Sequence, residues 1–367
     1  MANVYLFTGF PGFITTALIK RLVQQDYNAG QINLLVLPSM APQAREEVTR
    51  IARAENIGAD KFHILTGDIT MPGLGLDPAE NARLKDAVTH VFHLAAIYDL
   101  ATPEAVAYQV NVDGTREVNR WVLTLNNLKR YVYFSTAYVS GTREGRILET
   151  DLDKGQAFKN HYEATKFEAE KSARGLLDKV PTTIIRPGIV VGDSRTGETS
   201  KFDGPYFILN LFERLKWLPL LPYFGSGQAE ANFVPVDYVV DATLHLAHAD
   251  AGAGNTYHLT DPKPHIIREA YALMMAELLG QQPFGMLPLA AAQAALAIPA
   301  LRRWLGVEKE ALDYFTCQSY YDCAQAQRDL AGSGVQCPDL KDYVKPLIRF
   351  YQQHKGDPDK QVIGKFS

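Results

Sequence analysis

Cysteine is scarce in this sequence, and positive charge is not in excess. Cys317, Cys323 and Cys337 are the three cysteines among 367 residues, and none belongs to a CxxC pair. Three cysteines cannot all pair within one chain, so a disulfide-rich secreted scaffold is excluded and a reduced, intracellular protein is expected. The net charge of −4 gives no basic field, so we expect no nucleic-acid partner.

Long apolar runs are also missing. The longest, residues 286–301, is too short to span a bilayer and contains Pro288 and Pro299. One interpretation is a packed helix; the other is an amphipathic lid that touches lipid or an acyl chain, anchored by residues 302–304, RRW. The three residues before the first predicted strand leave no room for a signal peptide, so we expect a cytoplasmic protein, with peripheral membrane contact as an alternative.

The most informative stretch that is present is NVYLFTGFPGFIT, residues 3–15. An apolar run that predicts a buried strand is followed by a glycine turn, and then by apolar residues at helical spacing from Phe13 onward. Gly9 permits a tight turn, and Gly12 lets backbone N–H groups approach a pyrophosphate at the positive end of the helix. Thr15 stands where the usual pattern has its third glycine. The order of these elements predicts the phosphate-binding corner of a dinucleotide fold.

Strand and helix patterns alternate up to about Val191. Strands are predicted at residues 32–37, 62–65, 90–94, 131–136 and 182–188, and helices at 43–55, 109–126 and 161–177. Beyond Val191 the pattern changes, with a helix that ends at His248, a late strand at 255–259 and a helix at 266–279. This order predicts an α/β fold, a Rossmann-type doubly wound parallel sheet, with a smaller, mostly helical C-terminal substrate lobe. We expect residues 1–191, with 233–260 returning to them, to form the NAD(P)-binding domain, and 192–232 and 261–367 to form the lobe, whose C-terminal part is polar and mixed.

The ends of the predicted strands supply candidate cofactor contacts. Residues 38–39 follow the second strand, where an acid would accept the 2′-hydroxyl of NAD; neither an acid nor an arginine is present there. Asp68 follows the third strand and can hold the adenine amino group or cap a turn. His90 and His93 point to opposite faces of the fourth strand, so we interpret them as core or rim histidines and predict no metal site.

Tyr162, Lys166 and Thr136 form the predicted catalytic group. Tyr162 and Lys166 are four residues apart on a predicted helix and share one face. A nearby ammonium lowers the pKa of a phenol, which is otherwise about 10. Thr136 ends the fifth strand and can donate a hydrogen bond to a carbonyl oxygen. Tyr162 would protonate the carbonyl oxygen, Lys166 would tune the pKa of Tyr162, and Thr136 would polarise the carbonyl. Hydride delivery to a carbonyl requires these three tasks.

The motifs in this order resemble the extended short-chain dehydrogenase/reductase superfamily. They are TGxxG at 8–12, DI at 68–69, LAA at 94–96, NVxGT at 111–115, ST at 135–136, YxxxK at 162–166 and RPG at 186–188. TGFPGFI, GDIT, HLAAIYDL and the later stretches 192–206 and 233–242 resemble its fatty acyl-CoA and thioester reductase branch. In particular, they resemble the N-terminal reductase half of bacterial two-part fatty acyl reductases.

This resemblance implies NADPH as the cofactor, with NAD as an alternative, and a fatty aldehyde or acyl thioester as the substrate. It implies catalysis by Thr136, Tyr162 and Lys166, with Asn111 supporting a proton relay. The expected cofactor contacts are Thr8, Gly9, Phe10, Pro11, Gly12, Phe13, Ile14, Pro38, Ser39, Asp68, Ile69, Leu94, Ala95, Ala96, Tyr162, Lys166, Pro187, Gly188, Ile189 and Val190. The candidate substrate contacts are Tyr98, Ala137, Tyr138, Asp203 and Tyr206.

Two other functions fit the same scaffold. One is an NAD-dependent nucleotide-sugar epimerase or dehydratase, or a hydroxysteroid-type dehydrogenase. A sugar diphosphate would need basic residues in the lobe, where Lys201, Arg214 and Lys216 are available. The other is a catalytically silent dinucleotide sensor, which the intact Thr136, Tyr162 and Lys166 set disfavours. A homodimer is expected only by analogy with the superfamily.

Overall fold

A sheet of seven parallel strands organises the chain in the computed structural model, which describes residues 2–25, 27–98, 102–305 and 318–361. The strands are β1 (Asn3–Thr8), β2 (Ala29–Val36), β3 (Phe62–Thr66), β4 (His90–His93), β5 (Arg130–Phe134), β7 (Thr182–Pro187) and β11 (Asn255–Leu259). Their spatial order is β11-β7-β5-β4-β1-β2-β3, so the chain winds outward in both directions from the boundary between β1 and β4. The predicted Rossmann-type, doubly wound sheet is confirmed.

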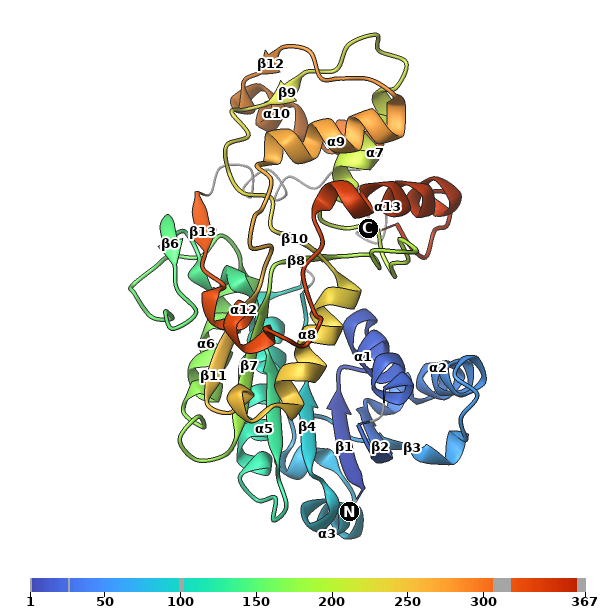
Figure 1. The fold of residues 1–367 in the computed structure, drawn as a ribbon, viewed down its shortest axis with the longest axis vertical. Coiled ribbons are helices and arrows are strands. Elements are labelled where there is room, and N and C mark those ends of the chain that lie inside the picture. The colour runs from blue at the N-terminus through green and yellow to red at the C-terminus, as the bar shows by residue number, and fades with distance from the viewer. Residues whose placement is uncertain (1, 26, 99–101, 306–317, 362–367) are drawn as a thin grey trace.

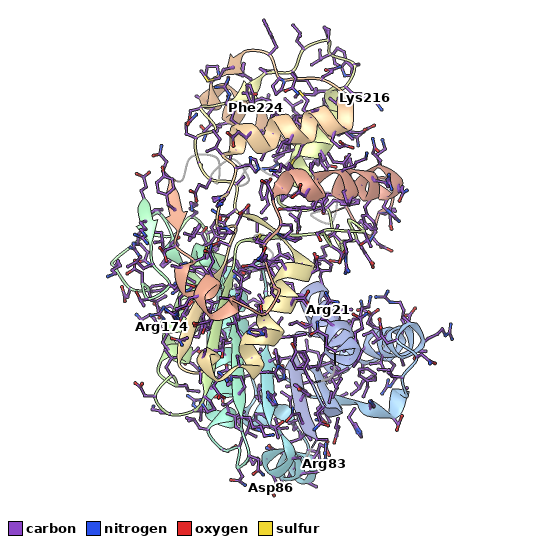
Figure 2. The ribbon with its side chains drawn as sticks, viewed as in Figure 1. Arg21, Arg83, Asp86, Arg174, Lys216 and Phe224 are labelled. Atoms are coloured by element: carbon purple, nitrogen blue, oxygen red, sulfur yellow. The ribbon has the colours of Figure 1, made fainter. Side chains whose placement is uncertain are left out.

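Side chains of each strand alternate between two cores, one on each face of the sheet. Tyr5 and Phe7 of β1 belong to one buried cluster, while Leu6 between them belongs to the other. The first face carries α1 (Phe13–Gln24), α2 (Ala41–Ala54), α8 (Val236–His248) and α12 (Ala324–Leu330). The second face carries α3 (Pro78–Ala87), α5 (Gly114–Val122) and α6 (His161–Arg174). Arg21 of α1, labelled in Figure 2, lies on the first face. It is paired with Asp241 of α8 at 2.5 Å, which links two helices on that face.

A smaller lobe stands beyond the carboxyl ends of the strands (Figure 1). It contains α7 (Tyr206–Leu215), α9 (Ile267–Leu279), α10 (Leu289–Leu296), α11 (Pro299–Leu305), α13 (Leu340–His354) and the paired strands β9 (Tyr223–Phe224) and β12 (Met286–Leu287). Two further parallel pairs are β8 (Ile189–Val191) with β10 (Phe233–Pro235), and β6 (Gly145–Ile147) with β13 (Ser319–Tyr321). Helices α7, α9 and α13 share a buried core of their own. The lobe is therefore mostly helical, as predicted.

Three segments differ from the sequence-based expectation. The helix expected at residues 109–126 is divided into α4 (Glu104–Tyr108), a π-helical turn Gln109–Asp113 and α5, which ends at Val122. Residues 286–301 are not one helix, because the chain begins there as β12 and Pro299 starts a new helix. The C-terminus contributes α13, whose buried residues recur at helical spacing although Pro346 lies inside it.

No helix in the described part of the chain is long and apolar enough to cross a membrane. Cys323 and Cys337 are free thiols, while Cys317 lies outside the described residues.

Candidate active site

One large cavity runs from the glycine turn of β1 into the lobe. Its volume is about 1680 Å³, which is larger than the usual range of roughly 300–1,000 Å³ for a site that holds one small ligand. It opens at the carboxyl ends of the strands, across the boundary between β1 and β4 where the sheet reverses direction. The cavity therefore has room for two ligands side by side.

The glycine turn is shaped to accept a phosphate group. Gly9 has φ of +84°, and a β-carbon there would lie 2.8 Å from the backbone nitrogen of Ala95. Gly12 is the N-cap of α1 and has no side chain to cap the helix, so the N–H groups of the first turn remain available. Residues Thr8 to Thr15 all line the cavity. A glycine turn followed by a helix N-terminus with available N–H groups is chemically suited to a pyrophosphate.

His93 fixes this turn to the neighbouring strand. Its Nδ1 lies 2.7 Å from Thr8 Oγ1, and its Nε2 lies 3.0 Å from Thr115 Oγ1. Thr8 Oγ1 also accepts hydrogen bonds from the backbone of Leu94 and Ala95. Burial lowers the pKa of His93 to about 3, so the ring is neutral and acts as a structural bridge. The interpretation of His93 as a core histidine is confirmed.

One end of the cavity lies beside β2 and β3. Leu37, Met40 and Gln43 line it, whereas Pro38 and Ser39 do not, because the chain turns through a 3-10 helix at Pro38–Met40. Asp68 and Ile69 line the cavity as expected. Asp68 Oδ1 also accepts hydrogen bonds from the backbone N–H and the hydroxyl of Thr70, each at 2.8 Å, so it serves as a turn residue as well.

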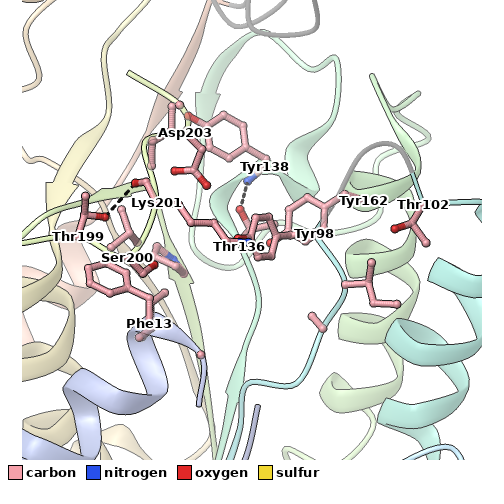
Figure 3. A pocket seen from close by; sticks show the side chains of 18 of the residues that line it. Phe13, Tyr98, Thr102, Thr136, Tyr138, Tyr162, Thr199, Ser200, Lys201 and Asp203 are labelled. Carbon is pink, nitrogen blue, oxygen red and sulfur yellow. Dashed lines mark hydrogen bonds between the residues drawn. The ribbon is translucent and has the colours of Figure 1, made fainter. Parts of the chain in front are cut away.

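Thr136 and Tyr162 meet at the mouth of the sheet (Figure 3). Thr136 lies two residues beyond β5, and its hydroxyl accepts a hydrogen bond from the Tyr138 N–H at 3.3 Å. Tyr162 is the second residue of α6, whose N-cap Asn160 accepts from Glu163 N–H. Burial raises the pKa of Tyr162 well above its ordinary value, and a hydrogen bond with Thr136 offsets part of that rise. The expected lowering of this pKa is not found.

The position of Lys166 explains why the pKa of Tyr162 is not lowered, because the side-chain nitrogen of Lys166 faces the sheet. Its Nζ donates to the carbonyl oxygen of Phe134 at 2.5 Å and lies 4.6 Å from the centre of the Tyr133 ring. Burial lowers the pKa of Lys166 to about 7, and the charge of Glu170 opposes that change. Lys166 is 3% exposed and still lines the cavity, one helical turn after Tyr162. The predicted pair therefore shares one helix face.

Replacing Lys166 with methionine is expected to stabilise the ligand-free protein at neutral pH. Between pH about 7 and its ordinary pKa of 10.5, Lys166 is neutral in the folded chain and charged in the unfolded chain, so wild-type stability rises with pH. Lys166→Met removes the cost of burying a charge and should raise the free energy of unfolding by roughly 1–3 kcal/mol near pH 7. Loss of the hydrogen bond from Lys166 to Phe134 opposes part of this gain. Urea unfolding at several pH values measures this gain, which should shrink toward pH 10. Lys171→Met, an exposed change on the same helix, is the control; equal gains in both variants would contradict the interpretation.

Asn111 lies behind the cavity and does not line it. Its side chain accepts from Ile97 N–H at 2.7 Å and donates to Ile97 O and to Thr165 Oγ1 at 2.9 and 3.0 Å. It thereby ties the loop after β4 to α6, the helix that carries Tyr162. A π-helical turn places it there, a distortion that is frequent at functional sites. The hydrogen bonds of the Asn111 side chain thus hold Ile97 and Thr165 in position.

Three of the five candidate substrate residues line the cavity, namely Tyr98, Tyr138 and Asp203. Asp203 and Lys201 lie across from Tyr162, and Lys201 Nζ donates to Tyr98 Oη at 2.9 Å (Figure 3). Burial raises the pKa of Asp203. Ala137 and Tyr206 are instead buried in packing outside the lining, and the Tyr206 hydroxyl accepts a hydrogen bond from Gly192 N–H.

The lobe adds an apolar arm to the cavity, in segments for which the sequence left an acyl-chain site and an ordinary core as alternatives. Helices α7, α10 and α11 together with β9 and β12 line this arm; its residues include Phe207, Leu211, Leu215, Phe224, Leu287, Ala292, Leu296, Leu301 and Trp304. The available signal was the apolar composition of residues 207–221 and 286–301, which fits an ordinary core equally well. Only the packing of α10 and α11 against α7 shows that a channel remains between them.

Comparison with known proteins agrees with this geometry. Residues 7–243 match the family model described as Male sterility protein. Fatty acyl-CoA reductase wat of Drosophila melanogaster is 27% identical over 274 residues, which cover 65% of this chain and 53% of that protein. Aldehyde reductase lnbA of Aspergillus flavus is 27% identical over 289 residues, covering 74% of this chain and 28% of that protein. The chain thus spans about half the length of these curated relatives, or less.

Among solved structures, the terminal R domain from the myxalamid PKS-NRPS biosynthetic pathway superposes with a TM-score of 0.81 and 25% identity. The match covers 97% of this chain and 91% of that one. The family model covers well over half of the sequence and includes the glycine turn, Thr136, Tyr162 and Lys166. The chain therefore belongs to the Male sterility protein family within the extended short-chain dehydrogenase/reductase superfamily.

Proposed function

We propose that this chain is an NADPH-dependent reductase of a fatty aldehyde or acyl thioester. One observation carries the proposal: a single cavity joins the glycine turn and the Thr136–Tyr162–Lys166 group to an apolar arm in the lobe. In this proposal residues 1–191 and 233–260 bind the cofactor. Residues 192–232 and 261–367 bind the substrate, apart from α12, which packs against α8 and β11.

The side chains at the mouth of the sheet have complementary tasks. The bound cofactor supplies the hydride. The hydroxyl of Tyr162 donates its proton to the carbonyl oxygen, because burial keeps that hydroxyl protonated at neutral pH. The hydroxyl of Thr136 donates a hydrogen bond to the same oxygen and stabilises the charge that develops there. Lys166 borders the place where the nicotinamide ribose would bind and can hydrogen-bond its hydroxyls.

The end of β2 supports a preference for NADPH. An enzyme that selects NAD places a carboxylate there to accept the 2′-hydroxyl, and that carboxylate repels a 2′-phosphate. Here Leu37, Met40 and Gln43 line the cavity, and none of them is acidic. Asp68 lies at the end of the next strand and is already engaged with Thr70.

The lobe arm favours an acyl chain over a sugar diphosphate. Phenylalanine, leucine and alanine side chains line it. Lys166 and Lys201 are the cations among the described residues that line the whole cavity. Arg214 and Lys216, which an epimerase would need to bind a diphosphate, lie outside the lining. The matched relatives are named as a fatty acyl-CoA reductase and an aldehyde reductase, which agrees with the same substrate class.

The direct test combines binding and turnover on one sample. Fluorescence titration should give a lower Kd for NADPH than for NADH. The same protein should then oxidise NADPH when decanal or decanoyl-CoA is added, and the relative rates separate the aldehyde step from the thioester step. Absence of NADPH and NADH consumption across a panel of aldehydes and acyl-CoAs would contradict the proposal.

Filling the lobe arm should shorten the preferred substrate. Ala292 of α10 is buried and lines the arm, so Ala292→Phe places a ring where the distal part of an acyl chain would lie. Overpacking of this kind costs about 1–3 kcal/mol, so kcat/KM for decanal should fall about tenfold or more, while that for propanal changes less than about twofold. The control is Ala294→Phe, an exposed change on the same helix. Equal losses for decanal and propanal would show that the arm does not hold the chain.

A further inference from the structure

Exposed apolar side chains are concentrated at the outer end of the lobe. We call residues 214–229 and 280–305 the lobe tip. Fifteen large hydrophobic residues of the described chain are exposed, and seven of them belong to the lobe tip, which holds 42 of the 367 residues. They are Trp217, Leu220, Phe284, Met286, Leu287, Ile298 and Trp304. Trp217 is 70% exposed and Phe284 is 67% exposed. Contact of such large apolar side chains with water is unfavourable, and it is relieved when another surface covers them.

Backbone contacts bring the two segments of the lobe tip together. The strands β9 and β12 pair in parallel, and Phe284 N–H donates to the carbonyl of Leu221 at 2.9 Å. Helix α11 packs against α7, which leads directly into Trp217. Figure 1 shows β9, β12 and α10 at the end of the molecule farthest from the sheet, and Figure 2 shows Lys216 and Phe224 in the same region. The exposed residues therefore lie on neighbouring segments at one end of the molecule.

The charge of the lobe tip is opposite to that of the whole chain. The two segments contain no aspartate or glutamate and four basic residues, Arg214, Lys216, Arg302 and Arg303, although the net charge of the chain is −4. Glu213 borders the tip, where it is paired with both Lys216 and Lys355. Aromatic and aliphatic side chains flanked by cations are typical of helices and loops that lie in the interface of an anionic bilayer.

Two exposed residues of the lobe tip also line the apolar arm of the cavity. Leu287 is 38% exposed and Trp304 is 45% exposed, yet both also line the cavity. The lobe contributes apolar residues such as Leu215, Phe224 and Leu296 to the same lining. An acyl chain that leaves a bilayer at the lobe tip would thus meet apolar residues as it enters the cavity.

We propose that the lobe tip docks on the surface of a bilayer that contains anionic lipid, with Trp217 and Phe284 inserted between the headgroups. The substrate then enters the cavity from the membrane side, past Leu287 and Trp304; this second statement rests on the proposed function, whereas docking itself does not. Arg214, Lys216, Arg302 and Arg303 meet the lipid phosphates. The two segments themselves contain no acidic residue, although Glu213 and Glu230 flank the first of them.

Flotation of the full chain with vesicles tests the docking. The vesicles consist of phosphatidylcholine alone or of phosphatidylcholine mixed with phosphatidylglycerol. The wild-type protein should float with the mixed vesicles and much less with phosphatidylcholine alone. The double variant Trp217→Ser/Phe284→Ser should bind about tenfold more weakly, and Arg214→Glu about fivefold more weakly. Leu123→Ser, which removes an exposed leucine at the end of α5, should bind like the wild type.

Two measurements keep the outcomes distinct. NADPH affinity should be the same in every variant, which shows that each is folded. Turnover of propanal, a water-soluble aldehyde, should also be unchanged, whereas that of a long-chain aldehyde in mixed vesicles should fall with binding. If no aldehyde is reduced but flotation follows the pattern above, the proposed function fails and the docking stands. Equal flotation of all variants, or self-association through the tip without vesicle binding, overturns the docking.

Discussion

Replacing Tyr162 with phenylalanine is expected to lower kcat about a hundredfold to ten-thousandfold and to leave the affinity for NADPH nearly unchanged. The ring and its packing at the start of α6 are retained, and only the hydroxyl that faces Thr136 is lost. In the proposed mechanism this hydroxyl is the proton donor, whereas the glycine turn and the end of β2, which are proposed to bind the dinucleotide, are unchanged by the substitution. Steady-state kinetics with decanal and fluorescence titration of NADPH measure the two effects.

A matched control excludes a general effect of losing a tyrosine hydroxyl. Tyr320 of β13 is exposed and does not line the cavity, so Tyr320→Phe should leave kcat unchanged. The pH profile examines the same proton. Because burial raises the pKa of Tyr162 above its ordinary value of 10.0, reduction should not decline through ionisation of this group anywhere near neutral pH. A Tyr162→Phe protein that retains full turnover, or that no longer binds NADPH, would contradict the assigned role.

Local spacing in the sequence was sufficient to predict that the proposed catalytic residues lie around one cavity. The glycine turn, Thr136 and the pair Tyr162 and Lys166 each depend on a strand end or on one helical turn, and such short-range patterns survive folding. The structure places all of them around one cavity. The direction in which Lys166 points was not predictable, because it depends on Phe134 of a strand that is distant in sequence.

The lobe shows where short-range patterns are insufficient. Helix α13 carries buried residues at the spacing of an amphipathic helix, a signal that was present in the sequence but interrupted by Pro346. Tyr206 and Ala137 lie on the expected segments, but their side chains turn into the packing. Whether a side chain faces a cavity or a core depends on tertiary contacts, and the same apolar composition is compatible with both.

The buried pair of Arg186 and Glu170 could not be predicted from spacing either, and it leads to the second large expected effect. Arg186 is the penultimate residue of β7 and Glu170 lies on α6; their side chains are 1% and 0% exposed. The guanidinium approaches Glu170 through Nη2 at 2.6 Å and Nε at 3.0 Å. Glu170 also accepts from Ser135 at 2.5 Å, so the pair fixes the residue before Thr136 against the helix that carries Tyr162.

Arg186→Met should lower the free energy of unfolding by about 3–5 kcal/mol, because it leaves a carboxylate buried without this partner. Urea denaturation of the ligand-free protein measures this loss. The double variant Arg186→Met/Glu170→Leu should recover much of it, since two apolar side chains can pack where the ion pair stood. Arg83→Met removes an exposed partner of Glu80 and should change stability by less than about 1 kcal/mol.

The pH dependence separates loss of charge pairing from loss of packing. Burial alone would raise the pKa of Glu170, but Arg186, Arg174 and Ser135 hold it below its ordinary value of 4.5. In the wild type, therefore, this group contributes stability above the unfolded-state pKa, and that contribution is lost as the pH falls. In Arg186→Met the balance shifts toward a raised pKa, so the folded chain retains a proton that the unfolded chain releases, and stability falls as the pH rises. The deficit should thus be larger at about pH 8 than at about pH 5. An equal deficit at both would mean that Arg186 acts through the packing of its side chain and not through its charge.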